Sequence, residues 1–260
     1  MIRKTAARVV SVAALPAPGH HVLTFEAPEL ARDARAGHFI SVSADTGPSI
    51  LRKPFSVFTV DPDSGVCSIL FSVYGPTTRA MARMQPGDTL DFIGPLGGRV
   101  FLPASGTDRH HILVGGGYGV PPLNFLARTL RREHPGARVT LVHGARTANL
   151  LVGADGLSEL GVDVVACTDD GSAGIHGRVT VALEPMLASG ASVYTCGPTP
   201  MMRAVAERCL ENGVPCQISM ETPMPCGVGI CVGCVVGKTD GTYSRTCVDG
   251  PVYSAGEVRW

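Results

Sequence analysis

The stretch ILVGGGYGVPPL, residues 112–123, decides the fold of the second half of the chain. It begins with a continuous apolar run, which is typical of a strand buried on both faces. Glycines then follow, and from residue 120 to residue 132 the apolar spacing becomes helical. A buried strand that turns through glycines into a helix is the opening of a βαβ unit. The stretch therefore predicts a parallel sheet with helices between its strands.

Further strands of the same kind follow this stretch. The segments RVTLVHGA, VDVVACTDD and ASVYTCGP are each followed by a loop or a helix. Alternation of strands and helices is typical of a doubly wound parallel sheet, and we expect an α/β domain over residues 103–216.

Two motifs of this domain predict a nucleotide site. The glycines of the first turn would let a dinucleotide pyrophosphate approach the backbone and the helix N-terminus; they are Gly115, Gly116, Gly117 and Gly119. The dinucleotide fingerprint is imperfect, because Val120 or Pro121 stands where its last glycine belongs, so an ordinary tight turn remains an alternative. The second motif, Cys196-Gly197-Pro198, also ends a strand, where ligands bind in open α/β sheets.

Residues 1–102 have a different pattern. Short apolar runs at regular spacing, separated by Gly, Pro, Asp and Ser, predict an antiparallel barrel or sandwich. One of these runs, LRKPFSVF, combines a cation, an aromatic ring and a hydroxyl that could hold a flavin, in the residues Lys53, Pro54, Phe55 and Ser56. Without other support, the same run is an ordinary strand.

Four cysteines mark a small module over residues 217–260. Cys226, Cys231, Cys234 and Cys247 have the spacing C-x4-C-x2-C-x12-C, which is that of plant-type [2Fe–2S] ferredoxins. Glycines between these cysteines would let backbone N–H groups approach the sulfurs. Structural zinc is the alternative, but it usually shows two C-x2-C pairs or added histidines, and the segment between Cys226 and Cys247 contains neither.

The composition excludes several other classes of function. The formal net charge is +0, which offers no basic field for nucleic acid, and no apolar run is long enough to span a membrane. The nine cysteines and the absence of a signal peptide predict a reducing cytoplasm rather than a secreted disulfide-linked domain.

The order of these parts resembles the ferredoxin–NADP⁺ reductase family. In that family a barrel with an R-x-[YF]-S strand precedes a nucleotide-binding domain, which begins with a G-G-G-x-G turn and has a C-G-P motif near its end. The four-cysteine module narrows the resemblance to electron-transfer subunits of NAD-dependent dihydroorotate dehydrogenases. Motifs that carry it across most of the chain are RKPFSV, IGPLGG, VGGGYGVPPL, VHGART, TDDGSAGIHGRVT, CGPTPMM, SMETPMPCGVGICVGC and CVDGPVY.

This resemblance implies FAD, a [2Fe–2S] cluster and an NADH site, and docking on a separate FMN-containing catalytic subunit, as an α2β2 heterotetramer. It implies hydride transfer from NADH to FAD, then release of single electrons to the cluster, with no protein nucleophile or general base. Cys196 would lie near the nicotinamide or in the core, and Glu221 near the flavin or in a solvated loop. Preference for NADH over NADPH is expected on the resemblance alone.

The chain departs from the family pattern at the flavin strands. Lys53 stands where the family has arginine, and lysine cannot make the planar bidentate contact with a phosphate. Arg52 is not an automatic substitute, because neighbouring residues of a strand face opposite sides. The family's Tyr-Arg-Val is here Phe71-Ser72-Val73, and its Gly-Thr turn is Thr77-Thr78, with Arg79 as a possible compensating cation.

Alternatives with the same layout remain open. They are an NAD(P)H–ferredoxin-type oxidoreductase, a sulfide dehydrogenase subunit and a hydrogenase diaphorase subunit. A redox sensor that binds flavin and cluster without sustained turnover belongs to another class, and the intact VGGGYGVPPL and CGPTPMM motifs disfavour it.

Overall fold

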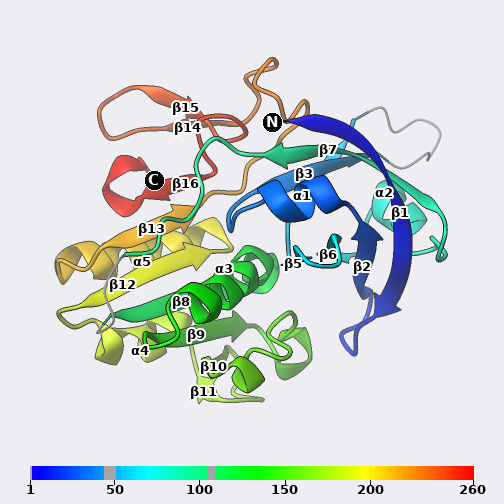
Figure 1. The fold of residues 1–260 in the computed structure, drawn as a ribbon. Helices are drawn as coiled ribbons and strands as arrows, with labels where there is room; N and C mark the ends of the chain where they lie inside the picture. The colour runs from blue at the N-terminus through cyan, green and yellow to red at the C-terminus, as the bar shows by residue number, and fades with distance from the viewer. Residues whose placement is uncertain (1, 44–50, 105–108) are drawn as a thin grey trace.

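The computed structural model describes residues 2–43, 51–104 and 109–260. Its described residues form two seven-stranded sheets and a two-stranded ribbon (Figure 1). The first sheet comes from the N-terminal part of the chain, and the second from the remainder. The predicted combination of an antiparallel β domain, a parallel α/β domain and a C-terminal module is confirmed.

The first sheet is antiparallel and has the order β4-β3-β7-β1-β2-β6-β5. Among the described residues β4 and β5 are its edges, so the described strands form a half-barrel rather than a closed barrel. Two short helices accompany its strands. The elements are β1 (Arg3–Ala14), β2 (His20–Glu26), α1 (Pro28–Asp33), β3 (Phe39–Ser43), β4 (Lys53–Ser56), β5 (Thr59–Asp61), β6 (Val66–Ser72), α2 (Pro76–Met81) and β7 (Thr89–Leu96).

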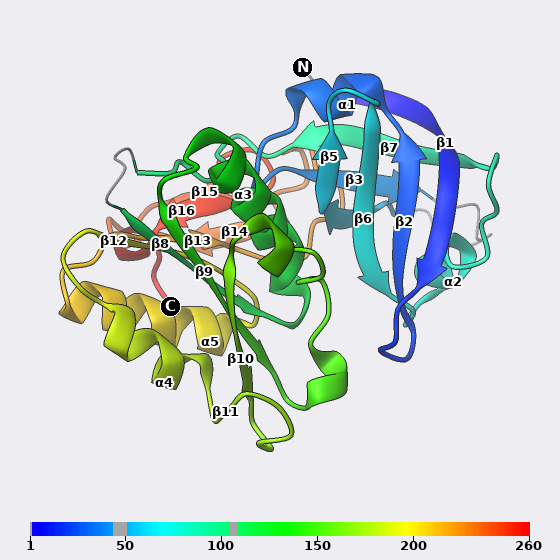
Figure 2. The same cartoon turned by 60° about the horizontal axis from the view of Figure 1, so that its bottom comes forward.

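The second sheet has the order β11-β10-β9-β8-β12-β13-β16, and all its strand pairs are parallel except β13 with β16. Helix α3 covers the face toward the half-barrel, and α4 and α5 cover the other face (Figures 1 and 2). The elements are β8 (His110–Gly116), α3 (Val120–Glu133), β9 (Arg138–Ala145), β10 (Asp163–Thr168), β11 (Ile175–His176), α4 (Val179–Leu183), β12 (Ala191–Cys196), α5 (Thr199–Glu211) and β13 (Cys216–Ser219).

The C-terminal part is joined to this sheet rather than separate from it. Strands β14 (Val235–Gly237) and β15 (Tyr243–Arg245) form the ribbon, and β16 (Val252–Ser254) pairs with β13. The predicted boundary between residues 216 and 217 therefore falls within strand β13. Five single-turn 3-10 helices complete the fold: Gly117–Gly119, Ala148–Leu150, Ser158–Leu160, Glu184–Met186 and Ala255–Glu257.

One hydrophobic core runs from the half-barrel into the parallel sheet through α3. Phe125, Leu126 and Leu130 of α3 are buried in the same apolar cluster as Phe25 and Phe92 of the barrel strands. Burial of this kind resists opening between the two sheets, since about 25 cal/mol is lost per Å² of apolar surface re-exposed. Among the described residues, no helix is both long and apolar enough for a membrane crossing.

Candidate functional site: a pocket at the domain junction and a thiol loop beside it

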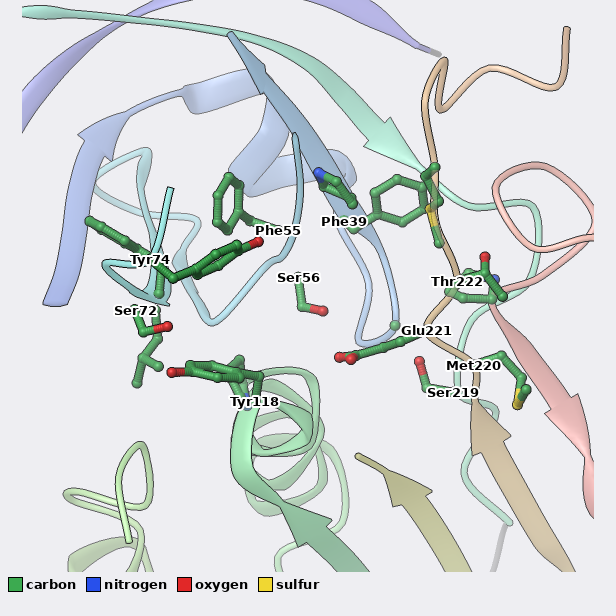
Figure 3. A pocket seen from close by; sticks show the side chains of 17 residues that line it. Phe39, Phe55, Ser56, Ser72, Tyr74, Tyr118, Ser219, Met220, Glu221 and Thr222 are labelled. Carbon is green, nitrogen blue, oxygen red and sulfur yellow. The ribbon is translucent and has the colours of Figure 1, made fainter. Parts of the chain in front are cut away.

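A pocket opens where the half-barrel meets the parallel sheet (Figure 3). Strands β4 and β6 form its barrel side, the start of α3 forms another side, and the segment after β13 closes it toward the C-terminal module. Five residues predicted to hold flavin line this pocket: Pro54, Phe55, Ser56, Phe71 and Ser72. The wall combines aromatic rings with a few hydroxyls, as small-molecule cofactor sites usually do.

Other predicted flavin residues are placed outside the pocket wall. Lys53 is half-buried at the start of β4, and Val73 follows β6. Thr77 and Thr78 are buried in α2, where the Thr78 hydroxyl accepts hydrogen bonds from the backbone N–H groups of Tyr74 and Gly75. Thr78 therefore shapes the turn that follows β6.

The two arginines near these strands differ in their surroundings. The Arg52 guanidinium donates to both carboxylate oxygens of Asp91, at 2.9 and 3.1 Å, and also to the carbonyl oxygens of Ser41 and Asp91. The Arg52 guanidinium is therefore engaged by Asp91 and by backbone carbonyls on the barrel side. Arg79 lies in the last turn of α2 with an exposed side chain.

The two predicted nucleotide motifs lie side by side. Cys196 at the end of β12 pairs with Gly115 at the end of β8. A Cβ atom on Gly119 would lie 1.9 Å from the carbonyl oxygen of Cys196, and one on Gly197 would lie 2.8 Å from that of Gly116. Only glycine permits this contact of backbone with backbone. The glycine turn and the C-G-P turn thus form one surface at the carboxyl edge of the sheet.

Sequence reasoning did not single out the aromatic residue at this edge. Tyr118, within the glycine turn, lines the pocket, and its hydroxyl lies 2.9 Å from Nε2 of His20 in β2. The two rings stack with centroids 5.5 Å apart. His20 in turn pairs across the sheet with Ser72 of the pocket wall. The signal that could have found Tyr118 is an aromatic residue inside a glycine-rich turn.

Cys196 lies in the core close to Glu221, which lines the pocket. Cys196 is fully buried, and burial, with a smaller contribution from the Glu221 charge, raises the pKa of its thiol. Its side chain belongs to the hydrophobic core. The Glu221 side chain is exposed at the pocket wall, yet surrounding protein removes part of its hydration and raises its pKa. In Figure 3 its carboxylate points into the pocket.

The four predicted ligand cysteines lie together as two pairs. The backbone N–H of Cys231 donates to Sγ of Cys226 at 3.5 Å, and Sγ of Cys234 lies 3.2 Å from Sγ of Cys247. The first pair, Cys226 and Cys231, is the outer pair and is open to solvent, with Cys231 exposed. The second pair, Cys234 and Cys247, is the inner pair and is buried. Two pairs suit a two-iron cluster, in which each iron takes two thiolates.

The surroundings of Cys226 favour the thiolate. Burial raises the pKa of the Cys226 thiol. Hydrogen bonds with the backbone of Cys231, Val228 and Ile230, and with the Cys231 side chain, outweigh burial and lower this pKa to about 6. For Cys247, burial and the neighbouring Cys234 thiol raise the pKa to about 12. No three His, Cys, Asp or Glu side chains of the described residues converge on a single point suited to one metal ion.

The residues present fit the expected groups. The aromatic wall of the pocket, with the Ser56 and Ser72 hydroxyls, suits a planar ring system with polar edges. The paired thiols, with N–H groups aimed at sulfur, suit an anionic iron–sulfur core.

Two family profiles match the chain. Residues 221–259 match the profile described as the iron–sulfur cluster binding domain of dihydroorotate dehydrogenase B, and residues 113–207 match that of the oxidoreductase NAD-binding domain. The first match contains the thiol loop, residues 226–234, and the second contains the glycine turn, residues 115–119. Together with the reductase-like fold, they support a [2Fe–2S] cluster, FAD and NAD(H) as the cofactor set.

Solved structures share the fold. The NADH-dependent reduced ferredoxin–NADP oxidoreductase superposes with a TM-score of 0.83 at 30% identity, over 98% of this chain and 90% of the other. The ferredoxin reductase of carbazole 1,9a-dioxygenase superposes with a TM-score of 0.67 at 24% identity, over 82% and 67% of the two chains, which shows the fold alone.

Curated relatives extend over nearly the whole chain. The electron transfer subunit of dihydroorotate dehydrogenase B (NAD(+)) from Geobacillus kaustophilus (strain HTA426) is 41% identical over 85% of this chain and 86% of its own. That of Streptococcus pneumoniae (strain ATCC BAA-255 / R6) is 32% identical over 99% of both chains. The protein therefore belongs to the family of electron transfer subunits of NAD-dependent dihydroorotate dehydrogenase B.

Proposed function

We propose that this chain carries electrons between NADH and an FMN-containing dihydroorotate dehydrogenase subunit, as half of an α2β2 heterotetramer. One observation carries the proposal: the pocket and the thiols share a wall. Phe39 and Met224 line the pocket and belong to the same apolar cluster as Cys234 and Cys247. A flavin site and a cluster site joined by packed side chains suit intramolecular electron transfer.

Each part of the chain has its own task in this scheme. Residues 1–102 hold FAD through the pocket side of β4 and β6, residues 103–216 bind NADH at the glycine and C-G-P turns, and residues 217–260 hold the cluster. When bound, these cofactors supply the hydride and electron chemistry. The protein orients them, excludes water from the apolar wall between them and keeps the Cys196 thiol protonated in the core.

The candidate site residues divide in the same way. Flavin contacts are proposed for the barrel residues Lys53, Pro54, Phe55, Ser56, Phe71, Ser72, Val73, Thr77 and Thr78. Nucleotide contacts are proposed for Gly115, Gly116, Gly117, Gly119, Cys196, Gly197 and Pro198. The cluster ligands are Cys226, Cys231, Cys234 and Cys247.

The surface beside the outer thiol pair supports a protein partner. Ile230 is 80% exposed and Val232 is 56% exposed, on either side of the exposed Cys231. Apolar side chains kept in water next to a redox centre are typical of a docking surface. A chain with nine cysteines, four of them proposed cluster ligands, suits a reducing compartment, the cytoplasm.

Copurification with a candidate FMN subunit, followed by assay of NADH-linked orotate reduction, tests the proposal. We expect the two chains to form a complex that reduces orotate with NADH. Neither subunit alone should carry out this reaction. A complex that forms and shows no orotate-dependent NADH oxidation would contradict it.

A second candidate has its own support. The likeness over 98% of this chain to the NADH-dependent reduced ferredoxin–NADP oxidoreductase favours a ferredoxin-linked role. Reduction of a ferredoxin by NADH, in the absence of any dihydroorotate dehydrogenase subunit, would support this alternative. Failure of NADH to bleach the flavin would leave only a redox sensor.

A further inference from the structure

The motif GPLGGR at the end of β7 packs along the segment that follows the last cluster ligand. Residues 97–99 lie against residues 248–251, and the backbone N–H of Arg99 donates to the carbonyl oxygen of Gly250 at 2.8 Å. The second segment begins beside Cys247 and reaches Pro251, which lines the pocket. A single short turn therefore joins the inner thiol pair to the pocket wall.

Glycine is required where these two segments touch. A Cβ atom on Gly98 would lie 1.9 Å from the carbonyl oxygen of Val248, the residue after Cys247. A Cβ atom on Gly97, whose φ is +107°, would lie 2.9 Å from the Pro251 ring. Any side chain at these positions must push the turn away, because backbone cannot yield as a flexible side chain can.

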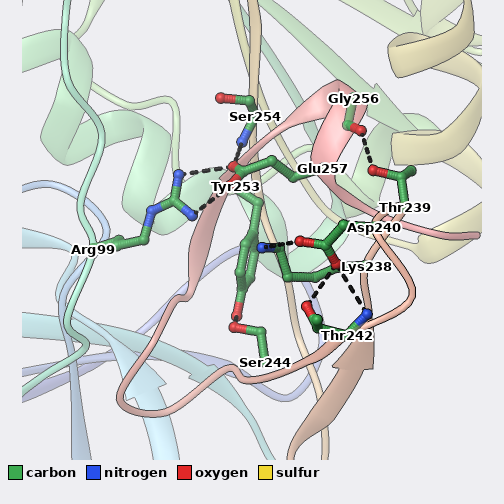
Figure 4. A network of polar contacts seen from close by, with 10 residues as sticks. All are labelled: Arg99, Lys238, Thr239, Asp240, Thr242, Ser244, Tyr253, Ser254, Gly256 and Glu257. Carbon is green, nitrogen blue, oxygen red and sulfur yellow. Dashed lines mark hydrogen bonds and ion pairs between the residues drawn. The ribbon is translucent and has the colours of Figure 1, made fainter.

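The Arg99 side chain fixes the far end of the same turn (Figure 4). Its guanidinium makes a bidentate pair with Glu257, at 3.1 and 2.8 Å, and lies 5.3 Å from the centre of the Tyr253 ring. The Glu257 carboxylate also accepts the backbone N–H of Ser254 at 2.8 Å. The planar arginine fork matches a carboxylate in a way that lysine cannot.

Tyr253 connects Arg99 to strand β15 of the C-terminal module. It is buried, and its hydroxyl lies 2.9 Å from the hydroxyl of Ser244 in β15. Close by, Arg245 pairs with Asp249 of the turn and donates to the carbonyl oxygen of Gly229 in the thiol loop at 3.0 Å. The turn is thus held from the barrel side by residues 97–99 and from the module side by Arg245.

We propose that Gly98 and Arg99 are positioning residues that set where Cys247, and with it the inner thiol pair, stands relative to the pocket. They act through the turn of residues 248–251 and touch neither the pocket nor the thiols. Groups around metal ligands hold those ligands in their productive geometry, and their loss commonly costs about 10- to 100-fold in metal affinity or activity. This inference rests on the proposed function, since it assumes a cluster at the four cysteines.

Gly98→Ala in the full chain tests the backbone contact, with Gly136→Ala as its matched control. Gly136 has no atom within 4 Å of an added Cβ and lies in the connection between α3 and β9. We expect iron release to a chelator to become about tenfold faster in Gly98→Ala, with an altered EPR spectrum of the reduced cluster. Flavin content and flavin bleaching by NADH should match the wild type. Wild-type iron release and EPR spectrum in Gly98→Ala would overturn the proposal.

Arg99→Gln and Arg99→Lys test the side chain, and they decide the matter if Gly98→Ala does not fold. Arg203→Gln is the control, because Arg203 makes an exposed ion pair with Glu207 on α5. We expect a shifted cluster reduction potential in Arg99→Gln, partial recovery in Arg99→Lys and none of this in the control. A purely structural role would lower the melting temperature of Arg99→Gln while leaving the potential unchanged, and that result would overturn the proposal.

The wild-type chain separates this proposal from the proposed function. Wild type that binds no iron, or whose flavin NADH does not bleach, would refute the proposed function itself. Wild type that passes both tests while the Gly98 and Arg99 variants behave identically to it would refute only the positioning role.

Discussion

The pocket proposed for flavin and the thiol loop proposed for the cluster are built in opposite ways. The pocket draws its wall from strands β4 and β6, from the start of α3 and from the segment after β13, which are far apart in sequence. Three of the four thiols come from a single loop of nine residues, 226–234, whose backbone N–H groups face sulfur. Only Cys247 arrives from outside that loop.

This difference predicts different responses to damage. A cluster held by four covalent ligands fails when one ligand is lost, because the remaining thiolates cannot complete both irons. A ring held by many side-chain contacts loses only the contribution of the residue removed. Mutations should therefore act in an all-or-none manner at the loop and in a graded manner at the pocket.

The largest expected effect is that of Cys231→Ser. We expect complete loss of the visible absorbance and EPR signal of the cluster, because an exposed ligand of the outer pair is removed. Flavin reduction by NADH should persist, since Cys231 does not line the pocket. Stopped-flow absorbance separates the two processes.

Ile230→Ser is the matched control for this variant. Ile230 is 80% exposed and neighbours Cys231 without supplying a thiol, so cluster absorbance should be retained. If Cys231→Ser also abolishes flavin reduction while remaining folded, the two regions are not independent and the proposed order of electron flow is wrong.

Acid should weaken the sheet beneath the pocket through His143. This histidine in β9 is buried, its Nε2 has no hydrogen-bond partner in the described structure, and burial lowers its pKa from 6.5 to about 4. Between these two values the unfolded chain binds a proton that the folded chain does not, so stability falls as pH falls. His143 alone should contribute about 3 kcal/mol to the loss of stability from pH 6.5 to pH 4.

Denaturant unfolding at several pH values measures this loss. The Cys231→Ser background keeps loss of the cluster out of the measurement. His143→Leu should reduce the pH dependence over this range without abolishing it, because burial also lowers the pKa of His38 and of His111 to about 4. His176→Leu, which leaves these three histidines in place, is the control. An unchanged slope in His143→Leu would assign the acid sensitivity to other groups.

Phe55→Ala should produce the graded response expected of the pocket. Phe55 lines the pocket and packs edge-on against Phe71, with ring centroids 6.2 Å apart. Loss of one aromatic ring should weaken FAD binding by roughly 10- to 100-fold, or about 1.4–3 kcal/mol. Flavin fluorescence during titration of the apoprotein measures the dissociation constant.

Tyr243→Ala provides the control for Phe55→Ala, because Tyr243 is 69% exposed and lies in the ribbon of the C-terminal module. Its FAD affinity should equal that of the wild type. Complete loss of FAD in Phe55→Ala, with the fold intact, would mean that the pocket also behaves in an all-or-none manner.

The thiol loop could be predicted from sequence because its chemistry is local. The spacing of Cys226, Cys231 and Cys234 fixes which residues meet, and the structure brings Cys247 to them. The strand-to-helix change at Gly115–Gly119 was predictable for the same reason.

The complete pocket wall could not be predicted, because it depends on how two sheets pack. Tyr118 and Met224 enter it only when α3 and the segment after β13 are brought against the barrel. The open edges of the half-barrel also depend on three-dimensional pairing, because each of β4 and β5 pairs with a neighbour on one side alone in the described sheet. The proposed role of the IGPLGG motif likewise needed the three-dimensional structure, in which a Cβ atom on Gly98 would lie 1.9 Å from the carbonyl oxygen of Val248.

The smallest expected effect is that of Tyr118→Phe, and it tests whether the pocket is a unit across both sheets. The variant keeps the ring that lines the pocket and stacks on His20, but it removes the hydroxyl that lies 2.9 Å from His20 Nε2. One hydrogen bond of this kind contributes about 1 kcal/mol, so we expect NADH affinity or the flavin reduction rate to change less than tenfold. His20→Phe removes the partner and should give the same change, and the double variant should show no further loss, because both substitutions break one contact. Cluster absorbance and FAD content should stay at wild-type values in all three. Additive losses in the double variant would show that Tyr118 and His20 act separately, and that the glycine turn is not tied to the barrel through this pair.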